Sequence, residues 1–181
     1  MLPIDEINQI FSTVQNDPNL HDLLASAVTE IAAEHLGSEY DKSYGKWIDS
    51  PPDELARNEA IYAEVAGKTF ADRIREYAEG DPALFMTSVA LLLETDGHRC
   101  RSEGTLAAGD ALASVGYTVT KVWRTMGDKA VRDPHVRLES KAVPLDEMFE
   151  IDGFQALGPG LFSVPEYDVN CRCRLELEVV S

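Results

Sequence analysis

The sequence has no hydrophobic run long enough to span a membrane, and it has few cysteines. No stretch approaches the roughly 18 apolar residues that a transmembrane helix needs, and residues 1 to 15 lack the basic and then apolar layout of a signal peptide. The three cysteines include Cys171 and Cys173, two positions apart, so a secreted disulfide framework is not expected. We expect free thiols and a protein made and kept in a cytoplasm.

Basic residues are also scarce, with 16 Lys and Arg against 32 Asp and Glu and a net charge of -16. Residues 1 to 100 hold 7 basic and 19 acidic groups, so the acidity lies mainly in the first half. Such a surface repels nucleic-acid backbones, which disfavours general DNA binding through the whole protein. A local patch remains as a secondary DNA contact, and it comprises Lys121, Arg124, Lys129, Arg132, Arg137 and Lys141. The simpler interpretation is a solvated loop region whose charges pair internally.

What the sequence does have is a helical first half with ordinary start and stop signals. Apolar residues recur at helical spacing over residues 7 to 14 and 20 to 31, and Gly37 is placed to end the second helix. Residues 38 to 50 show no sustained period and indicate a loop. Proline and acidic start signals then predict a helix from about residue 53 to 78 and another from Pro82 through Leu93.

The second half changes character. Residues 98 to 114 are helical in pattern, and residues 117 to 124 alternate as a strand does. Residues 171 to 180 alternate as well, which predicts a strand whose inner face carries both cysteines and whose outer face is charged. Short turns and a hairpin are expected between these two strands. The fold class is therefore α+β, with a helical region at 1–97 and a small mixed α/β domain at 98–181.

An ordered set of motifs runs through the second half. No single motif in this set is specific for a family, but the motifs in this order are. The set begins with Arg101-Ser102-Glu103 on a helix and Trp123-Arg124-Thr125 on a strand, and continues with Asp128, Arg132 and His135, then Pro144, Asp146 and Phe149, and last Asn170, Cys171 and Cys173. In this set the chain resembles the phage Mu F-like head morphogenesis family of minor head proteins.

The resemblance implies a structural minor head or capsid protein of a tailed phage or prophage. Such a protein acts in prohead assembly or genome delivery through contacts with the portal, the major capsid protein or both. The expected location is the virion, in the capsid interior or near the portal, after synthesis in the bacterial host cytoplasm. We expect no enzyme activity, no cofactor and no membrane contact. The alternative is a small nucleic-acid-processing enzyme or toxin relative that uses His135.

Three interpretations compete for the chemistry of the second half. In the structural one, which we favour, Asp128 and Asn170 cap turns, Arg132 binds a carboxylate or carbonyls, and the cysteines fill a small core. In the second, Cys171, Cys173 and His135, with His98 or Cys100, bind zinc. We expect no metal, because a Cys-x-Cys pair on a continuous strand closes a zinc site poorly. In the third, His135 or Cys171 is catalytic, which needs a cleft and an activated thiolate.

The acidic helical half also suggests where a partner binds. Its apolar stripes need cover, so we expect these helices to dock on a capsid or portal subunit through salt-sensitive contacts. On this interpretation, removing residues 1 to 80 abolishes incorporation into proheads and leaves a folded remainder.

Overall fold

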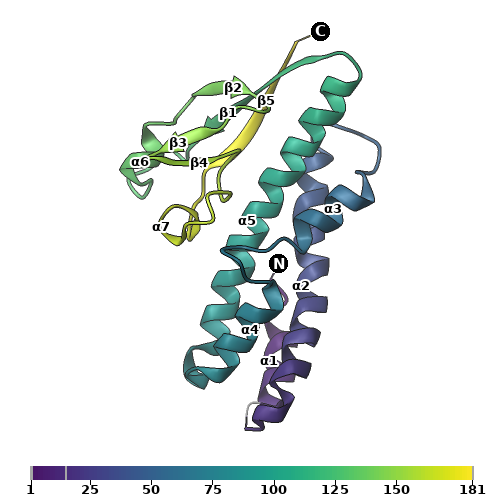
Figure 1. Cartoon of the computed structure of the whole chain (residues 1–181), viewed down its shortest axis with the longest axis vertical. Helices are drawn as coiled ribbons and strands as arrows, with labels where there is room; N and C mark the ends of the chain where they lie inside the picture. The colour runs from purple at the N-terminus through teal and green to yellow at the C-terminus, as the bar shows by residue number, and fades with distance from the viewer. Residues whose placement is uncertain (1, 15, 181) are drawn as a thin grey trace.

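The computed structural model describes residues 2–14 and 16–180, and it has a helical first half beside a small sheet (Figure 1). The α+β prediction is confirmed. The helical half contains α1 (Ile4–Val14), a short 3-10 helix (Pro18–Leu20), α2 (His21–Tyr44), α3 (Glu54–Ile61), α4 (Phe70–Glu79) and α5 (Pro82–Ser114). The remainder contains β1 (Thr118–Arg124), α6 (Asp133–Val136), β2 (Ala142–Pro144), β3 (Phe149–Ile151), β4 (Phe154–Ala156), α7 (Pro165–Asp168) and β5 (Arg174–Val180).

The two long helices α2 and α5 lie side by side and run in the same direction (Figure 1). Gly104 permits their close approach, because a Cβ atom there would lie 2.4 Å from the Tyr40 carbonyl oxygen. The other helices cover this pair, and Phe11 of α1 stacks on Phe85 of α5 with ring centroids 3.9 Å apart. The apolar stripes of the first half are thus buried against one another in a single core. Our expectation that these stripes need a partner for cover is wrong for most of their residues, although Leu23 is 63% exposed.

Gly37 does not end the second helix, and most of the predicted loop from 38 to 50 is helical. The helix continues to Tyr44, and Tyr40 and Tyr44 add to its buried face. Gly37 instead makes room for Arg57, since a Cβ atom would lie 2.1 Å from that guanidinium. Arg57 in turn donates two hydrogen bonds to Asp41, at 2.7 and 2.9 Å. Tertiary packing therefore overrides the local preference of glycine.

The helix predicted from 53 to 78 is two helices. The break lies at Val65–Lys68, where Ala66 and Gly67 have φ angles of 53° and 74° in a tight turn. Thr69 and Asp72 then form a capping box that starts α4. The break predicted between Leu93 and residue 98 is absent, because Gly97 packs beside the His35 ring within one continuous helix.

The predicted pairing of the two alternating strands is confirmed. The sheet has the order β2-β1-β5, with both neighbours antiparallel to β1 and Trp123 opposite Leu175. The predicted hairpin between them is β3 with β4. However, β5 begins at Arg174, so Cys171 and Cys173 precede the strand. A second core lies beneath this sheet, centred on Trp123.

Helix α5 belongs to both regions. In Figure 1 it stands between α2 on one side and the sheet on the other. The boundary expected between 97 and 98 falls inside this helix. Val119 and Leu177 of the sheet also join the helical core, and Gly109 of α5 packs against Leu145 and Leu177. Within the described residues, no helix is both long and apolar enough to cross a membrane.

Candidate functional site

The motif residues of the second half meet around the buried indole of Trp123. Trp123 has no exposed surface. Its ring contacts His135 of α6 and Phe149 of β3 nearly at right angles, with centroids 5.5 Å and 5.3 Å apart. Edge-to-face contacts of this kind are favoured between aromatic rings and fix their orientation. The indole therefore joins one helix and two strands.

His135 also brings the two cysteines of the Cys-x-Cys pair together. Its Nδ1 atom lies 3.6 Å from Cys171 Sγ and 3.4 Å from Cys173 Sγ, and all three residues are buried. Their ligand-type atoms lie within 4.8 Å of one another. The premise that the cysteines lie on a continuous strand is wrong, because both lie in the segment without regular secondary structure between Asn170 and the start of β5. His98 and Cys100, which we had considered as further ligands, are not members of this cluster.

Cys171 and Cys100 are poorly suited to nucleophilic catalysis. A hydrogen bond with Cys173, together with burial, raises the pKa of Cys171. The same hydrogen bond lowers the pKa of Cys173. Burial raises the pKa of the remote Cys100 thiol to about 12. Because the thiolate is the attacking species, the environment of Cys171 opposes that role.

Arg132 and Asp168 hold the irregular segment that leads into the cysteines. The Arg132 guanidinium donates to the carbonyl oxygens of Tyr167 and Val169. The buried Asp168 carboxylate accepts from the backbone amides of Phe162 and Val164, both at 3.3 Å. Burial raises the pKa of Asp168 against the effect of these bonds. Both side chains thus form hydrogen bonds with backbone groups of this irregular segment, which have no partner in a helix or strand.

Two further motif residues shape the turns on either side of this cluster. Asp128 accepts from the Ala130 amide at 3.0 Å and from the Arg172 guanidinium at 2.8 Å, and both partners of the ion pair are exposed. Asn170 has a φ angle of 56° in the left-handed region, which asparagine adopts more readily than most residues.

A row of contacts from α5 holds the same segment from the other side. His98 Nε2 donates to the Cys173 carbonyl oxygen at 2.6 Å, and Ser102 Oγ donates to the Pro159 carbonyl oxygen at 2.7 Å. Gly160 has a φ angle of 79°, and a Cβ atom there would lie 2.5 Å from His98 Nδ1. Burial lowers the pKa of His98 to about 4, so its ring is neutral. Sequence reasoning missed these contacts, although short turns were expected in this segment.

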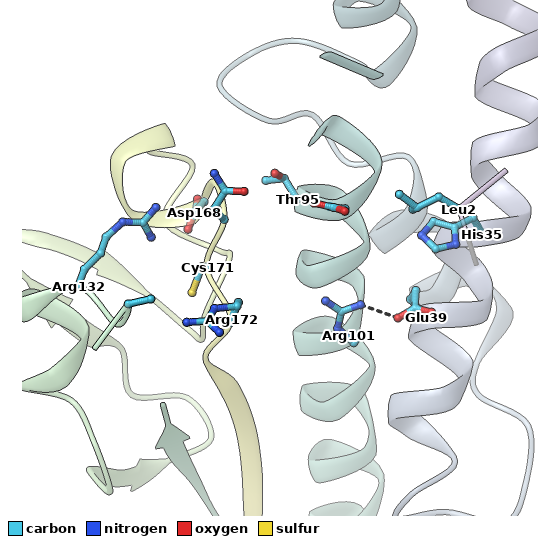
Figure 2. A pocket seen from close by; sticks show the side chains of 12 residues that line it. Leu2, His35, Glu39, Thr95, Arg101, Arg132, Asp168, Cys171 and Arg172 are labelled. Atoms are coloured by element: carbon cyan, nitrogen blue, oxygen red, sulfur yellow. Dashed lines mark hydrogen bonds and ion pairs between the residues drawn. The ribbon is translucent and has the colours of Figure 1, made fainter. Parts of the chain in front are cut away.

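A cavity of ≈ 660 Å³ lies between the segment around Cys171 and the helices α2 and α5. Figure 2 shows Arg132, Asp168, Cys171 and Arg172 on one wall and Arg101, His35 and Glu39 on the other. Arg101 of α5 pairs with Glu39 of α2. Glu103, two residues along, is partly covered, and burial raises its pKa. Cys171 is the one member of the cysteine and histidine cluster among the described residues that line this cavity.

The motif at residues 144 to 149 covers the edge of the sheet. Pro144 ends β2 and accepts a hydrogen bond from the Glu147 amide at 3.2 Å, while Asp146 is exposed in this turn. Lys121 of β1 reaches beneath the turn, where its ammonium donates to the Leu145 carbonyl oxygen at 2.6 Å. Lys121 has no exposed surface, and burial lowers its pKa to about 8. Its predicted DNA contact is wrong, because phosphate cannot reach this group.

The other basic residues of the predicted patch differ in accessibility. Arg132 is bound to carbonyls, and Arg124 donates to Glu176 at 3.0 Å between β1 and β5. Arg137 pairs with Asp152 on the surface. Lys129 and Lys141 are exposed. The structure therefore leaves a smaller basic surface than the six residues indicated.

The geometry favours the structural interpretation over the catalytic one. A general base needs a cleft in which it meets a substrate, and it needs a group that orients it. His135 is 2% exposed and enclosed by thiols and aromatic rings. The carboxylates of Asp128 and Asp168 are bound to Arg172 and to backbone amides respectively. His135 and these carboxylates are thus bound by other groups of the protein.

Comparison with known proteins identifies the family. The family model described as Phage Mu protein F like protein matches residues 54–176. The chain belongs to this family. The match starts well before residue 98, so the family likeness extends further into the helical half than the motifs indicated. It includes α3, α4 and the whole of α5, which agrees with the shared role of that helix.

Two curated relatives resemble parts of the chain. One is the NAD(+)--arginine ADP-ribosyltransferase EFV of Enterococcus faecalis (strain ATCC 700802 / V583), 34% identical over 131 residues, which are 71% of this chain and 26% of that protein. Another is the Minor head protein GP7 of Bacillus phage SPP1, 31% identical over 93 residues, or 51% of this chain and 30% of that protein. The chain thus spans under a third of either relative. No solved structure matches it.

Proposed function

We propose that the chain is a structural minor head protein of a tailed phage or prophage that acts in prohead assembly or genome delivery. The observation that carries this proposal is its family membership, together with its likeness to a phage minor head protein. The internal use of motif residues supports a structural role, since Trp123 and Arg132 serve packing and backbone contacts.

An ADP-ribosyltransferase activity has less support. The relative with that name aligns over only 26% of its length, and its activity belongs to that whole protein. The described residues of the present chain bring His135 and the cysteines together inside a core, where a dinucleotide has no access. Incubation with NAD⁺ and free arginine should therefore give no ADP-ribosylarginine.

The proposed docking surface is the exposed acidic face of the helical half, and its partner is a portal or capsid subunit. The first 100 residues carry 7 basic and 19 acidic groups. Since most residues of the apolar stripes are buried within the bundle, we base the docking proposal on charge. Glu30 and Glu34 lie exposed on α2 and belong to this surface.

Deleting residues 1 to 80 is a poor test of this docking surface. The deletion would expose the face of α5 that carries Phe85, Val89 and Leu93, all of which are buried against the removed helices. Loss of incorporation would then reflect unfolding as readily as loss of docking. Exposed point substitutions separate the two effects.

The sharper experiment reverses charge at Glu30→Lys with Glu34→Lys. A matched control, Glu147→Lys with Glu166→Lys, makes the same change in net charge at exposed positions of the second half. Proheads assembled with each variant are purified, and the chain in them is quantified by mass spectrometry. We expect the α2 variant to be depleted several-fold and the control to be retained. Equal amounts of the α2 variant and the control in proheads would contradict docking through the acidic face of the helical half.

A further inference from the structure

The three side chains of His135, Cys171 and Cys173 form a cluster that packing alone leaves unexplained. Their ligand-type atoms lie within 4.8 Å of one another, and the three residues are between 2% and 8% exposed. Nδ1 of one imidazole faces both sulfur atoms. That nitrogen has a single proton or a single lone pair in the ring plane, so it cannot make a full hydrogen bond to both thiols.

The distances between these atoms fit a shared metal ion. Zinc binds thiolate sulfur at about 2.3 Å and imidazole nitrogen at about 2.0 to 2.1 Å, with tetrahedral angles. Those values place a nitrogen and a sulfur ligand about 3.5 Å apart. The observed distances from His135 Nδ1 are 3.6 Å to Cys171 Sγ and 3.4 Å to Cys173 Sγ.

Space for one ion exists beside the cluster. A small cavity of ≈ 10 Å³ is lined by all three residues together with Arg132 and Asn170. A volume of that order holds about one water-sized particle. The backbone is also arranged for such a site, because Asn170 in the left-handed region leads into an extended segment with both cysteines buried and Arg172 between them exposed.

We propose that His135 Nδ1 and the thiolates of Cys171 and Cys173 bind one Zn²⁺ ion, with a water molecule as the fourth ligand. Two thiolates and one imidazole suit zinc, which accepts both sulfur and nitrogen ligands. Binding releases the two thiol protons to solvent, and the two thiolates balance the charge of the ion. Water is assigned to the fourth position because the cluster includes no fourth protein ligand among the described residues.

The ion would connect α6 to the segment before β5, next to Trp123. These parts are far apart in sequence and have little regular secondary structure between them. A metal that links them stabilises the second core in the folded state alone, so removing it lowers the melting temperature. This inference does not depend on the proposed head function, and it reverses the expectation of no metal that the sequence pattern gave.

The test is the zinc content of the purified full-length chain after gel filtration, measured by elemental analysis. We expect one zinc ion per chain, lost in Cys171→Ser and in Cys173→Ser. The matched control is Cys100→Ser, which removes a buried thiol outside the cluster and should keep the ion. Circular dichroism of each variant verifies its fold.

Cobalt substitution of the wild-type chain tests the same site by absorption spectroscopy and needs no variant. Thiolate ligands give intense charge-transfer absorption with Co²⁺, so these bands are expected on cobalt binding and should vanish when excess zinc is added. Wild-type protein without stoichiometric zinc and without these bands would overturn the proposal, as would a disulfide between Cys171 and Cys173. Zinc retained equally in all three serine variants would place the ion elsewhere and also overturn it.

Discussion

The helical region and the motif-bearing region are stabilised by different means. The first core is built from long helices, whose backbone groups are paired within each helix and whose side chains need only pack. The second core lies among strands of three to seven residues and irregular turns, and its backbone relies on side chains such as Arg132 and Asp168. The family motif therefore lies mostly in the part of the chain with least regular secondary structure. Its residues form hydrogen bonds to the backbone as well as packing contacts.

The largest expected effect of a single substitution is in the second core. Trp123→Ala should lower the free energy of unfolding by about 3 to 5 kcal/mol, because the indole is fully buried and contacts two other rings. Chemical denaturation monitored by circular dichroism measures this loss. Trp47→Ala is the control, since Trp47 is only partly buried at the margin of the helical core, and it should cost less. A loss below about 1 kcal/mol at Trp123 would contradict the packing described.

In the helical region the corresponding test is a buried ion pair. Arg73 of α4 donates to both carboxylate oxygens of Asp96 on α5, at 2.9 and 2.6 Å, and Asp96 is 1% exposed. Arg73→Ala leaves that charge buried without its main partner and should cost about 3 kcal/mol of unfolding free energy. Arg75→Ala on the same helix removes two exposed ion pairs, with Asp22 and with Asp72, and should cost far less. Equal losses would mean that the burial of Asp96 has no energetic consequence.

A smaller effect is expected from Lys121, and it depends on pH. Burial lowers the pKa of Lys121 to about 8, below the value of about 10.4 in an unfolded chain. Between these two values the unfolded state holds more protons, so stability should rise with pH by about 1 to 3 kcal/mol. Lys121→Met should abolish this rise when unfolding curves at pH 8 and above are compared with the wild type. An unchanged pH dependence in the variant would show that Lys121 is not the group responsible.

The smallest effect concerns DNA, which we treat as a secondary contact. Lys129→Ala with Lys141→Ala should weaken the binding of duplex DNA at low salt by a few-fold, because both lysines are exposed. Lys121→Met is the control and should leave binding unchanged, since that ammonium is buried. Fluorescence anisotropy at two salt concentrations measures both. Equal weakening by the two variants would contradict the division of the basic patch.

The sequence predicted the parts of the fold that depend on local patterns. The alternation of residues 117 to 124 and of residues 171 to 180 identified the central strand pair, and proline with an acidic cap located the start of α5. Glycine misled the prediction where its role is tertiary. Gly37 was placed to end a helix, but it is needed for the close approach of Arg57. Such contacts join residues far apart and leave no local signal.

The sequence predicted which residues form the candidate site better than it predicted how they are arranged. His135, Cys171 and Cys173 were named together, but the assumption that the cysteines lie on a strand gave the wrong argument about metal. The role of Lys121 was missed because its charge suggested exposure, whereas its ammonium is held by a carbonyl group in the turn after β2. The hydrogen bonds by which His98 and Ser102 hold the segment before β5 were not predicted, since their partners are backbone oxygens about 57 to 75 residues away.

The most direct test of the structural head role is the amount of this chain in purified proheads. Proheads are isolated by gradient centrifugation from cells in which the phage or prophage genome expresses the chain, and each protein is quantified by mass spectrometry. A structural minor head protein should be present at a fixed ratio to the portal protein from one preparation to the next. Its absence from proheads, while it accumulates normally in the same cells, would contradict the account.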